Sequence, residues 1–137
     1  AMAGELMAHH AAHPESTAPI GYCTDVSHGY ADASGTVVYD HMTLLEAALP
    51  WTTEIHLKNT DARFGSTFGF SPAERERGIV DIAAVTGLLR RQADRLPVTE
   101  LTGYLEIGGP KLGRDYSDRE LEGQLRASLR HLRETFV

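Results

Sequence analysis

Three segments of this chain with the pattern of β-strands each carry a residue of metal-ligand type at or near the carboxyl end. These residues are Asp25 in segment 19–25, His56 in segment 52–59 and Glu106 in segment 99–109. Parallel strands bring their carboxyl ends to one edge of a sheet, where α/β proteins place their chemistry. Carboxylate and imidazole ligands together suit Mn²⁺, Mg²⁺, Co²⁺ or Zn²⁺. The spacing predicts one divalent-metal site, with three unrelated strand-end polar residues as the alternative.

The stretch EIHLKNTD shows how one strand can serve both a core and a site. Ile55 and Leu57 alternate with Glu54, His56 and Lys58, which is the pattern of a half-buried strand. The polar face is either solvated or the rim of an active site. Lys58 shares that face with His56, so it can bind an anionic substrate group or balance the charge of Glu54.

The strands alternate with helical segments, which predicts an α/β fold with a parallel sheet. Helices are expected at 3–13, 40–50, 72–96 and 118–136. Asp40 is a candidate N-cap, and Ser71 with Glu74 and Ser117 with Glu120 have capping-box spacing. Segment 26–35 is expected to be a loop, since no Asn-Gly hairpin signal joins two strands.

Composition restricts the class of protein. The 137 residues allow one domain, and a net charge of -6 disfavours a nucleic-acid or anionic-membrane surface. No apolar run approaches the roughly 20 residues of a membrane span, and no secretory signal is visible. A single cysteine, Cys23, excludes an internal disulfide and is expected to be a packed thiol. These features predict a cytoplasmic protein.

Three motifs in order suggest a family. CTDVSHG contains Asp25-x-x-His28, EIHLKNTD follows one helix later, and GYLEIGG follows after another. From about residue 15 onward this order resembles the C-terminal half of the xylose isomerase-like TIM-barrel superfamily. That group includes sugar and sugar-phosphate isomerases, ketose 3-epimerases, and related lyases and dehydratases. The resemblance implies that residues 1–137 form a single partial (β/α)₈ barrel domain, about strands six to eight.

The resemblance also implies roles for individual residues. In the family a glutamate, an aspartate, a histidine and a second glutamate hold one metal ion. The last three fall on Asp25, His56 and Glu106, and the first has no counterpart in this sequence. His28 falls on a substrate-binding histidine of the family. Glu106 would act both as a metal ligand and as the acid/base. The reaction would be isomerisation or epimerisation of a sugar or sugar phosphate through an enediolate, a reaction of carbohydrate metabolism, and manganese is one suitable metal.

Further candidate substrate-binding residues lie in loops. Arg63 follows His56 by seven residues, and Lys111 lies in a glycine-containing loop before an expected helix. TIM barrels often bind phosphate after strands seven and eight, so Lys111 could contact a phosphate or carboxylate; a basic surface loop is the alternative.

Two other functions remain open from the sequence. One is a catalytically incomplete α/β binding or assembly module, and the other is a lyase or dehydratase on the same barrel. A nuclease on this barrel is disfavoured by the acidic balance. Three strands cannot close a barrel of about 250 residues. We therefore expect a homo-oligomer, or a longer protein that supplies the N-terminal half.

Overall fold

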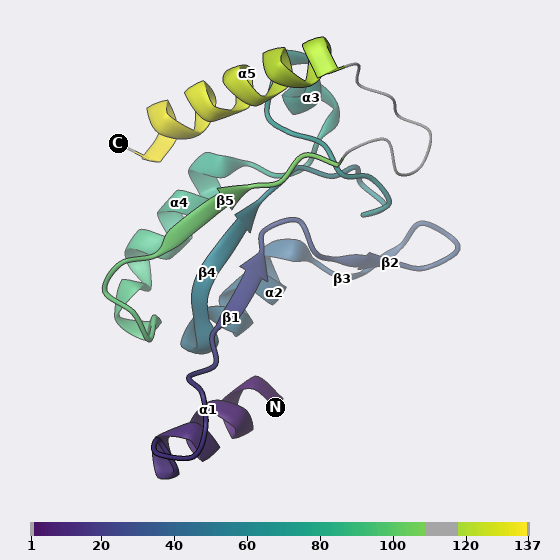
Figure 1. Cartoon of the computed structure of the whole chain (residues 1–137). Coiled ribbons are helices and arrows are strands. Elements are labelled where there is room, and N and C mark those ends of the chain that lie inside the picture. The colour runs from purple at the N-terminus through teal and green to yellow at the C-terminus, as the bar shows by residue number, and fades with distance from the viewer. Residues whose placement is uncertain (1, 109–117, 137) are drawn as a thin grey trace.

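Three short strands form one parallel sheet. The computed structural model describes residues 2–108 and 118–136. Strands β1 (Tyr22–Asp25), β4 (Thr52–Leu57) and β5 (Thr102–Leu105) lie side by side in the order β1-β4-β5, and both pairings are parallel (Figure 1). The protein is therefore an α/β protein, as the alternation of strands and helices predicts. All three strands are shorter than the segments expected from the sequence, because pairing ends where a neighbouring strand ends.

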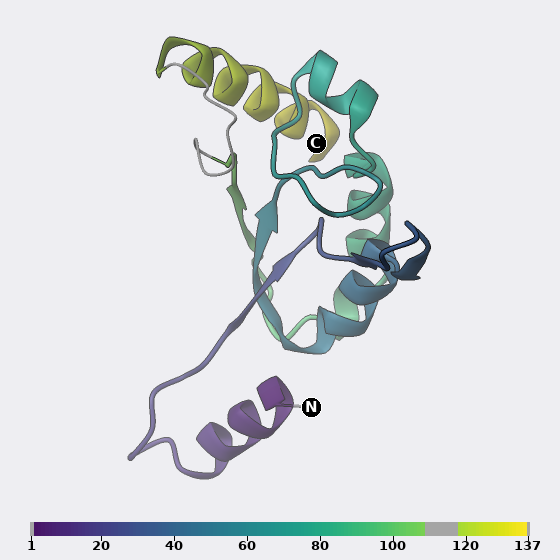
Figure 2. The same cartoon turned by 90° about the vertical axis from the view of Figure 1, so that its right-hand side faces the viewer.

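Helices connect the strands and cover one face of the sheet. Between β1 and β4 lie α2 (His41–Ala48) and the 3₁₀ helix η1 (Leu49–Trp51). Between β4 and β5 lie α3 (Pro72–Arg77), α4 (Ile82–Arg91) and the 3₁₀ helix η2 (Ala93–Arg95), and α5 (Asp118–Phe136) follows. Figure 2 shows α2 and α4 on the same side of the sheet. The first helix, α1 (Met2–Ala12), has no buried residue and lies below the sheet in Figure 1.

The hydrophobic core lies between the sheet and these helices. Ile55 and Leu57 on β4 are buried against Leu45 of α2, Val85 of α4 and Leu132 of α5. Polar residues alternate with them along β4 and lie on the opposite face of the sheet, which none of the described helices covers (Figure 2). Among the helices described, none has the length and apolar character needed to cross a bilayer.

Two of the predicted helix starts are confirmed. The carboxylate of Asp40 accepts hydrogen bonds from Met42 N at 2.9 Å and Thr43 N at 3.2 Å, and so caps α2. Ser71 and Glu74 form the predicted capping box at the start of α3. The corresponding box at Ser117 lies outside the described residues.

The prediction of one helix across 72–96 is wrong. Helix α3 ends at Arg77, its C-cap Gly78 has an extended backbone, and α4 starts anew with Asp81 as N-cap. The break has a tertiary cause. The side chain of buried Asn59 lies so close to Gly78 that a Cβ there would be 2.2 Å from Asn59 Nδ2. Asn59 Oδ1 also accepts a hydrogen bond from Val80 N at 3.0 Å, which holds the connection between the two helices.

The expectation of a plain loop without a hairpin after β1 is also wrong. Strands β2 (Tyr30–Ala31) and β3 (Val37–Tyr39) pair antiparallel as a small hairpin. The carboxylate of Asp32 closes its turn by accepting from the backbone N of Ser34 and of Thr36, and Gly35 takes a φ of 88°. Hydrogen bonds from the Ser34 side chain and Thr36 hold the pKa of Asp32 below its usual value.

Candidate metal centre

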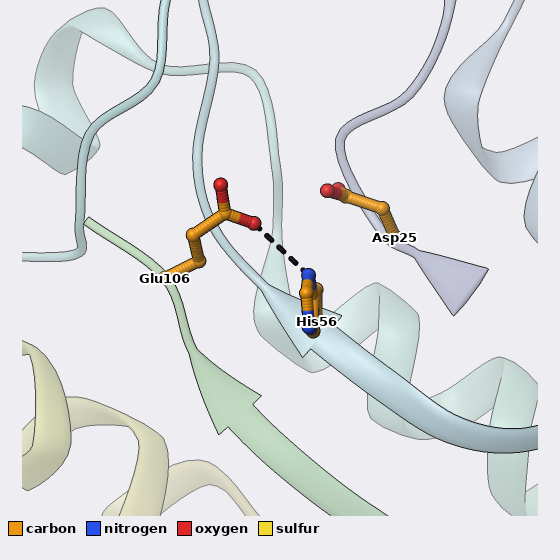
Figure 3. A group of neighbouring side chains, drawn as sticks. All are labelled: Asp25, His56 and Glu106. Carbon is orange, nitrogen blue, oxygen red and sulfur yellow. Dashed lines mark ion pairs between the residues drawn. The ribbon is translucent and has the colours of Figure 1, made fainter. Parts of the chain in front are cut away.

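Strand register brings the three predicted ligands together. Asp25 of β1 is paired with His56 of β4, and Glu106 N donates to Leu57 O at 3.0 Å, so the pairing with β4 continues past the end of β5. Because side chains alternate along a strand, Asp25 and His56 project from the face opposite to Ile55. Figure 3 shows Asp25, His56 and Glu106 directed into one space beyond the ends of three neighbouring strands.

The geometry of this cluster suits a small cation. One donor atom from each residue can be chosen so that all three lie within 4.8 Å of one another. Ligand atoms around a divalent ion lie about 2.0–2.6 Å from it, so two ligands are separated by at most roughly 5 Å. The donor set of two carboxylates and one imidazole fits Mn²⁺, Mg²⁺, Co²⁺ or Zn²⁺. Within the described part of the chain the cluster has these three members.

The Asp25 carboxylate is held by its own loop. Ser27 donates two hydrogen bonds to Asp25 Oδ1, one from its backbone N and one from its hydroxyl, both at 2.8 Å. The Asp25 side chain is only 5% exposed. Ser27 was not among the residues predicted for the site, although Asp-x-Ser spacing is a known signal for such a turn. This turn fixes one carboxylate oxygen and directs the other, Oδ2, toward the cluster.

Lys58 lies inside the cluster. Its Nζ is 2.8 Å from Asp25 Oδ2 and 3.7 Å from Glu106 Oε2, while His56 Nδ1 is 3.0 Å from the same Glu106 oxygen. Within the described residues the ion-pair partners of Lys58 are Asp25 and Glu106, and Glu54 is not among them. The register explains this result, because the ammonium reaches across to β1 and β5 rather than back along its own strand.

A small polar pocket adjoins the cluster. Its volume is about 110 Å³, and its lining residues are Ser27, His28, Gly29, Lys58, Thr60, Phe64, Ser66 and Thr67. The predicted substrate-binding His28 is exposed at this pocket, with Nε2 at 3.4 Å from Asp25 Oδ2. Phe64 has a positive φ of 58°, and its ring lies against Gly29, where a Cβ would be 2.3 Å from it. The hydroxyl of Thr60 is buried without a hydrogen-bond partner among the described residues.

Backbone pairing between Asn59 and Phe68 closes the loop that carries these pocket residues. Asn59 N donates to Phe68 O at 2.7 Å, and Phe68 N donates to Asn59 O at 3.1 Å. The loop between them was expected from its glycine, but neither Phe64 nor Thr60 was predicted to line a pocket. Their part depends on how the closed loop faces the turn after β1, and no local pattern reports that contact.

The other two predicted substrate-binding residues do not join the cluster. The guanidinium of Arg63 lies beside Gly35 at the turn of the β2–β3 hairpin. Lys111 lies outside the described residues. The structure thus gathers Asp25, His28, His56, Lys58 and Glu106 at one place, and puts Arg63 at the hairpin.

Cys23 corrects another expectation. It was predicted to be a packed thiol, but it is exposed on the face of the sheet that carries the cluster. Packing around the sulfur, followed by the negative charges of Glu54, Asp25 and Glu106, raises the pKa of the Cys23 thiol. A raised pKa lowers the thiolate fraction, so this cysteine is a poor nucleophile.

A second, apolar cavity is remote from the Asp25–His56–Glu106 cluster. It measures about 530 Å³ and lies between β5, α4 and α5. Leucine side chains dominate its wall, as at Leu89, Leu101 and Leu129, and it includes no member of the Asp25–His56–Glu106 cluster. Its apolar character continues the hydrophobic core and supplies no ligand for a cation.

Comparisons of the chain with protein-family models, with curated proteins and with solved structures find no match. The description of the protein therefore rests on its geometry alone. It is an α/β protein with a candidate divalent-metal centre at the carboxyl edge of a parallel sheet.

Proposed function

We propose that this chain carries the metal centre of a divalent-metal-dependent isomerase or epimerase that acts on a sugar or sugar phosphate through an enediolate. One observation carries the proposal: Asp25, His56 and Glu106 converge from three adjacent parallel strands to within 4.8 Å. Three ligands of these types leave further coordination positions for substrate oxygens and water, which is the arrangement of a catalytic rather than a structural metal site.

In this proposal Asp25, His56 and Glu106 hold the metal ion. When bound, the ion polarises a substrate carbonyl and stabilises negative charge on the neighbouring oxygen. Glu106 is 41% exposed at its side chain, so its carboxylate can also reach the carbon next to that carbonyl and remove a proton. The Asp25 side chain is 5% exposed and is fixed by Ser27, so it is suited to holding the metal ion and not to transferring a proton.

The adjoining pocket supplies the substrate side. His28 is exposed at the pocket and can donate a hydrogen bond to a hydroxyl or carbonyl oxygen. The buried hydroxyl of Thr60, which has no hydrogen-bond partner within residues 2–108 and 118–136, can bind a second oxygen there. A volume of about 110 Å³ accommodates a few hydroxylated carbons rather than a whole polymer, so a small polyhydroxylated substrate fits this side of the site.

A measurement of metal binding tests whether Asp25, His56 and Glu106 form a site. Calorimetric titration with Mn²⁺ should show one site per chain in the wild-type protein and no measurable binding in the Asp25→Ala/His56→Ala double variant. Arg63→Ala is a matched control, because Arg63 is exposed, lies beside Gly35 at the hairpin and is not a member of the cluster. Equal affinity in the double variant and the wild type would refute the site.

We further propose that the sheet is part of a (β/α)₈ barrel completed by a second copy or by additional chain. Within the described residues β1 and β5 each pair on one side only, and Tyr22 and Tyr104 on them are exposed. Unpaired strand edges favour association with further strands. Light scattering on the 137-residue chain should show an oligomer or polydisperse association, whereas a monodisperse, cooperatively melting monomer would contradict this part of the proposal.

A further inference from the structure

We propose that the ammonium group of Lys58 is the resident cation of the Asp25–His56–Glu106 cluster, and that a divalent metal ion must displace it. Lys58 would then set how tightly the metal binds. This inference rests on the proposed function, because it concerns the same cluster.

The contacts of Lys58 are those that a metal ion would need. Its Nζ lies 2.8 Å from Asp25 Oδ2 and 3.7 Å from Glu106 Oε2, so it contacts both carboxylates of the cluster. A divalent ion on these oxygens would lie within a few ångströms of the ammonium group, and the repulsion between the two positive charges makes joint occupancy unfavourable. Occupancy by Lys58 and occupancy by metal are therefore alternatives.

Burial strengthens the attraction between Lys58 and Asp25 that a metal ion would have to overcome. The side chains of Lys58 and Asp25 are only 12% and 5% exposed, so their attraction is weakly screened by water. Without a neighbouring cation the buried Asp25 carboxylate would be left with Ser27 and His28 as its polar contacts. Removing one partner of a buried ion pair destabilises the folded state, because an uncompensated charge remains.

The pocket beside the cluster gives the displaced ammonium a place to go. Lys58 lines this pocket, and its Nζ already lies 3.5 Å from His28 Nε2 at the pocket's edge. The flexible four-carbon stem of lysine allows such a move without a change of backbone. In the metal-bound state Lys58 would face the polar pocket and the Thr60 hydroxyl, which has no partner in the described part of the chain.

Two opposite effects of one substitution follow. Without metal, loss of Lys58 should destabilise the fold, because Asp25 loses its cation. With metal, the same loss should strengthen binding, because no ion pair has to be broken. A lysine that merely supports the ligands would behave differently, since its removal would weaken the site in both states.

The experiment compares Lys58→Met and Lys58→Gln with the wild type by Mn²⁺ calorimetry and thermal unfolding. Lys58→Gln retains a neutral hydrogen-bond donor in place of the ammonium group. The test can therefore still be made with this variant if Lys58→Met does not fold. The charge-matched control is Arg91→Met, because Arg91 is exposed on the last turn of α4, away from the cluster. We expect both Lys58 variants to bind Mn²⁺ about ten- to a hundredfold more tightly than the wild type. The control should change affinity by less than about twofold.

Unfolding supplies the second readout. In chelator the Lys58 variants should melt several degrees below the wild type, and saturating Mn²⁺ should raise their melting temperature by more than it raises that of the wild type. Unchanged or weaker Mn²⁺ binding in both variants would overturn the role of Lys58 while leaving the metal site intact. Absence of Mn²⁺ binding in every protein would instead overturn the proposed function and this inference with it.

Discussion

The two faces of strand β4 differ although their residues alternate along one short segment. Ile55 and Leu57 are buried against the helices, whereas Glu54, His56 and Lys58 lie on the open face, which has no covering helix among those described. The helix-covered face holds its residues by packing, and the open face holds them by charge and hydrogen bonding. One strand can therefore serve stability and chemistry separately, because successive side chains point to opposite sides.

The largest expected effect is on the open face. In a protein assembled to full activity, Glu106→Gln keeps the shape of the side chain but removes its basic carboxylate. We expect exchange of the substrate C–H proton with deuterated water to fall by about 10²- to 10⁴-fold. His28→Ala should lower the rate less, because it removes only a hydrogen bond to substrate. Exchange at the wild-type rate in Glu106→Gln would show that this residue is not the base.

The next effect separates the two faces by stability. Ile55 is 2% exposed, and Ile55→Ala should reduce the free energy of unfolding by about 3 kcal/mol through lost burial and a residual cavity. His56→Ala, one residue along and on the other face, should change it by less than about 1 kcal/mol while abolishing metal binding. Chemical denaturation of the metal-free proteins measures both values. Equal losses would mean that the faces do not divide stability and chemistry.

A smaller effect tests the helix side of the sheet. The Asp81 carboxylate accepts hydrogen bonds from Ala83 N at 2.8 Å and Ala84 N at 3.3 Å at the start of α4. Asp81→Ala should therefore cost about 1 kcal/mol of unfolding free energy and leave Mn²⁺ affinity unchanged. Glu100→Ala serves as the control, because Glu100 is an exposed acidic residue that caps no described helix. A loss of metal affinity in Asp81→Ala would contradict the separation.

The smallest effect depends on pH. Burial, followed by the positive charge of Arg75, lowers the pKa of His131 on α5, which packs near Phe70. The unfolded chain then binds a proton at this residue more readily than the folded chain. Acidification below the usual histidine range should destabilise the fold through His131 by less than about 1 kcal/mol, with the effect absent above that range. His131→Gln should show a shallower loss of unfolding free energy between about pH 7.5 and pH 5; an unchanged slope would exclude this residue as the cause.

Local patterns were sufficient to predict much of the fold. The alternation around Ile55 and His56 predicted β4, and the caps at Asp40 and Ser71 predicted two helix starts, because these signals depend on residues within a few positions of one another. The break at Gly78 could not be predicted in the same way. It depends on Asn59, nineteen positions away in the chain, whose side chain fills the space beside the glycine.

By itself, the sequence determined that Asp25, His56 and Glu106 lie at or near the carboxyl ends of three strands and therefore at one edge of a parallel sheet. Only the tertiary structure decided what these residues contact. Lys58 pairs with Asp25, Ser27 holds that same carboxylate, and Arg63 turns away to the hairpin. The physical reason is distance along the chain: strand-end positions follow from local alternation, whereas the partner of a long side chain depends on strand register and on how separate loops fold toward each other.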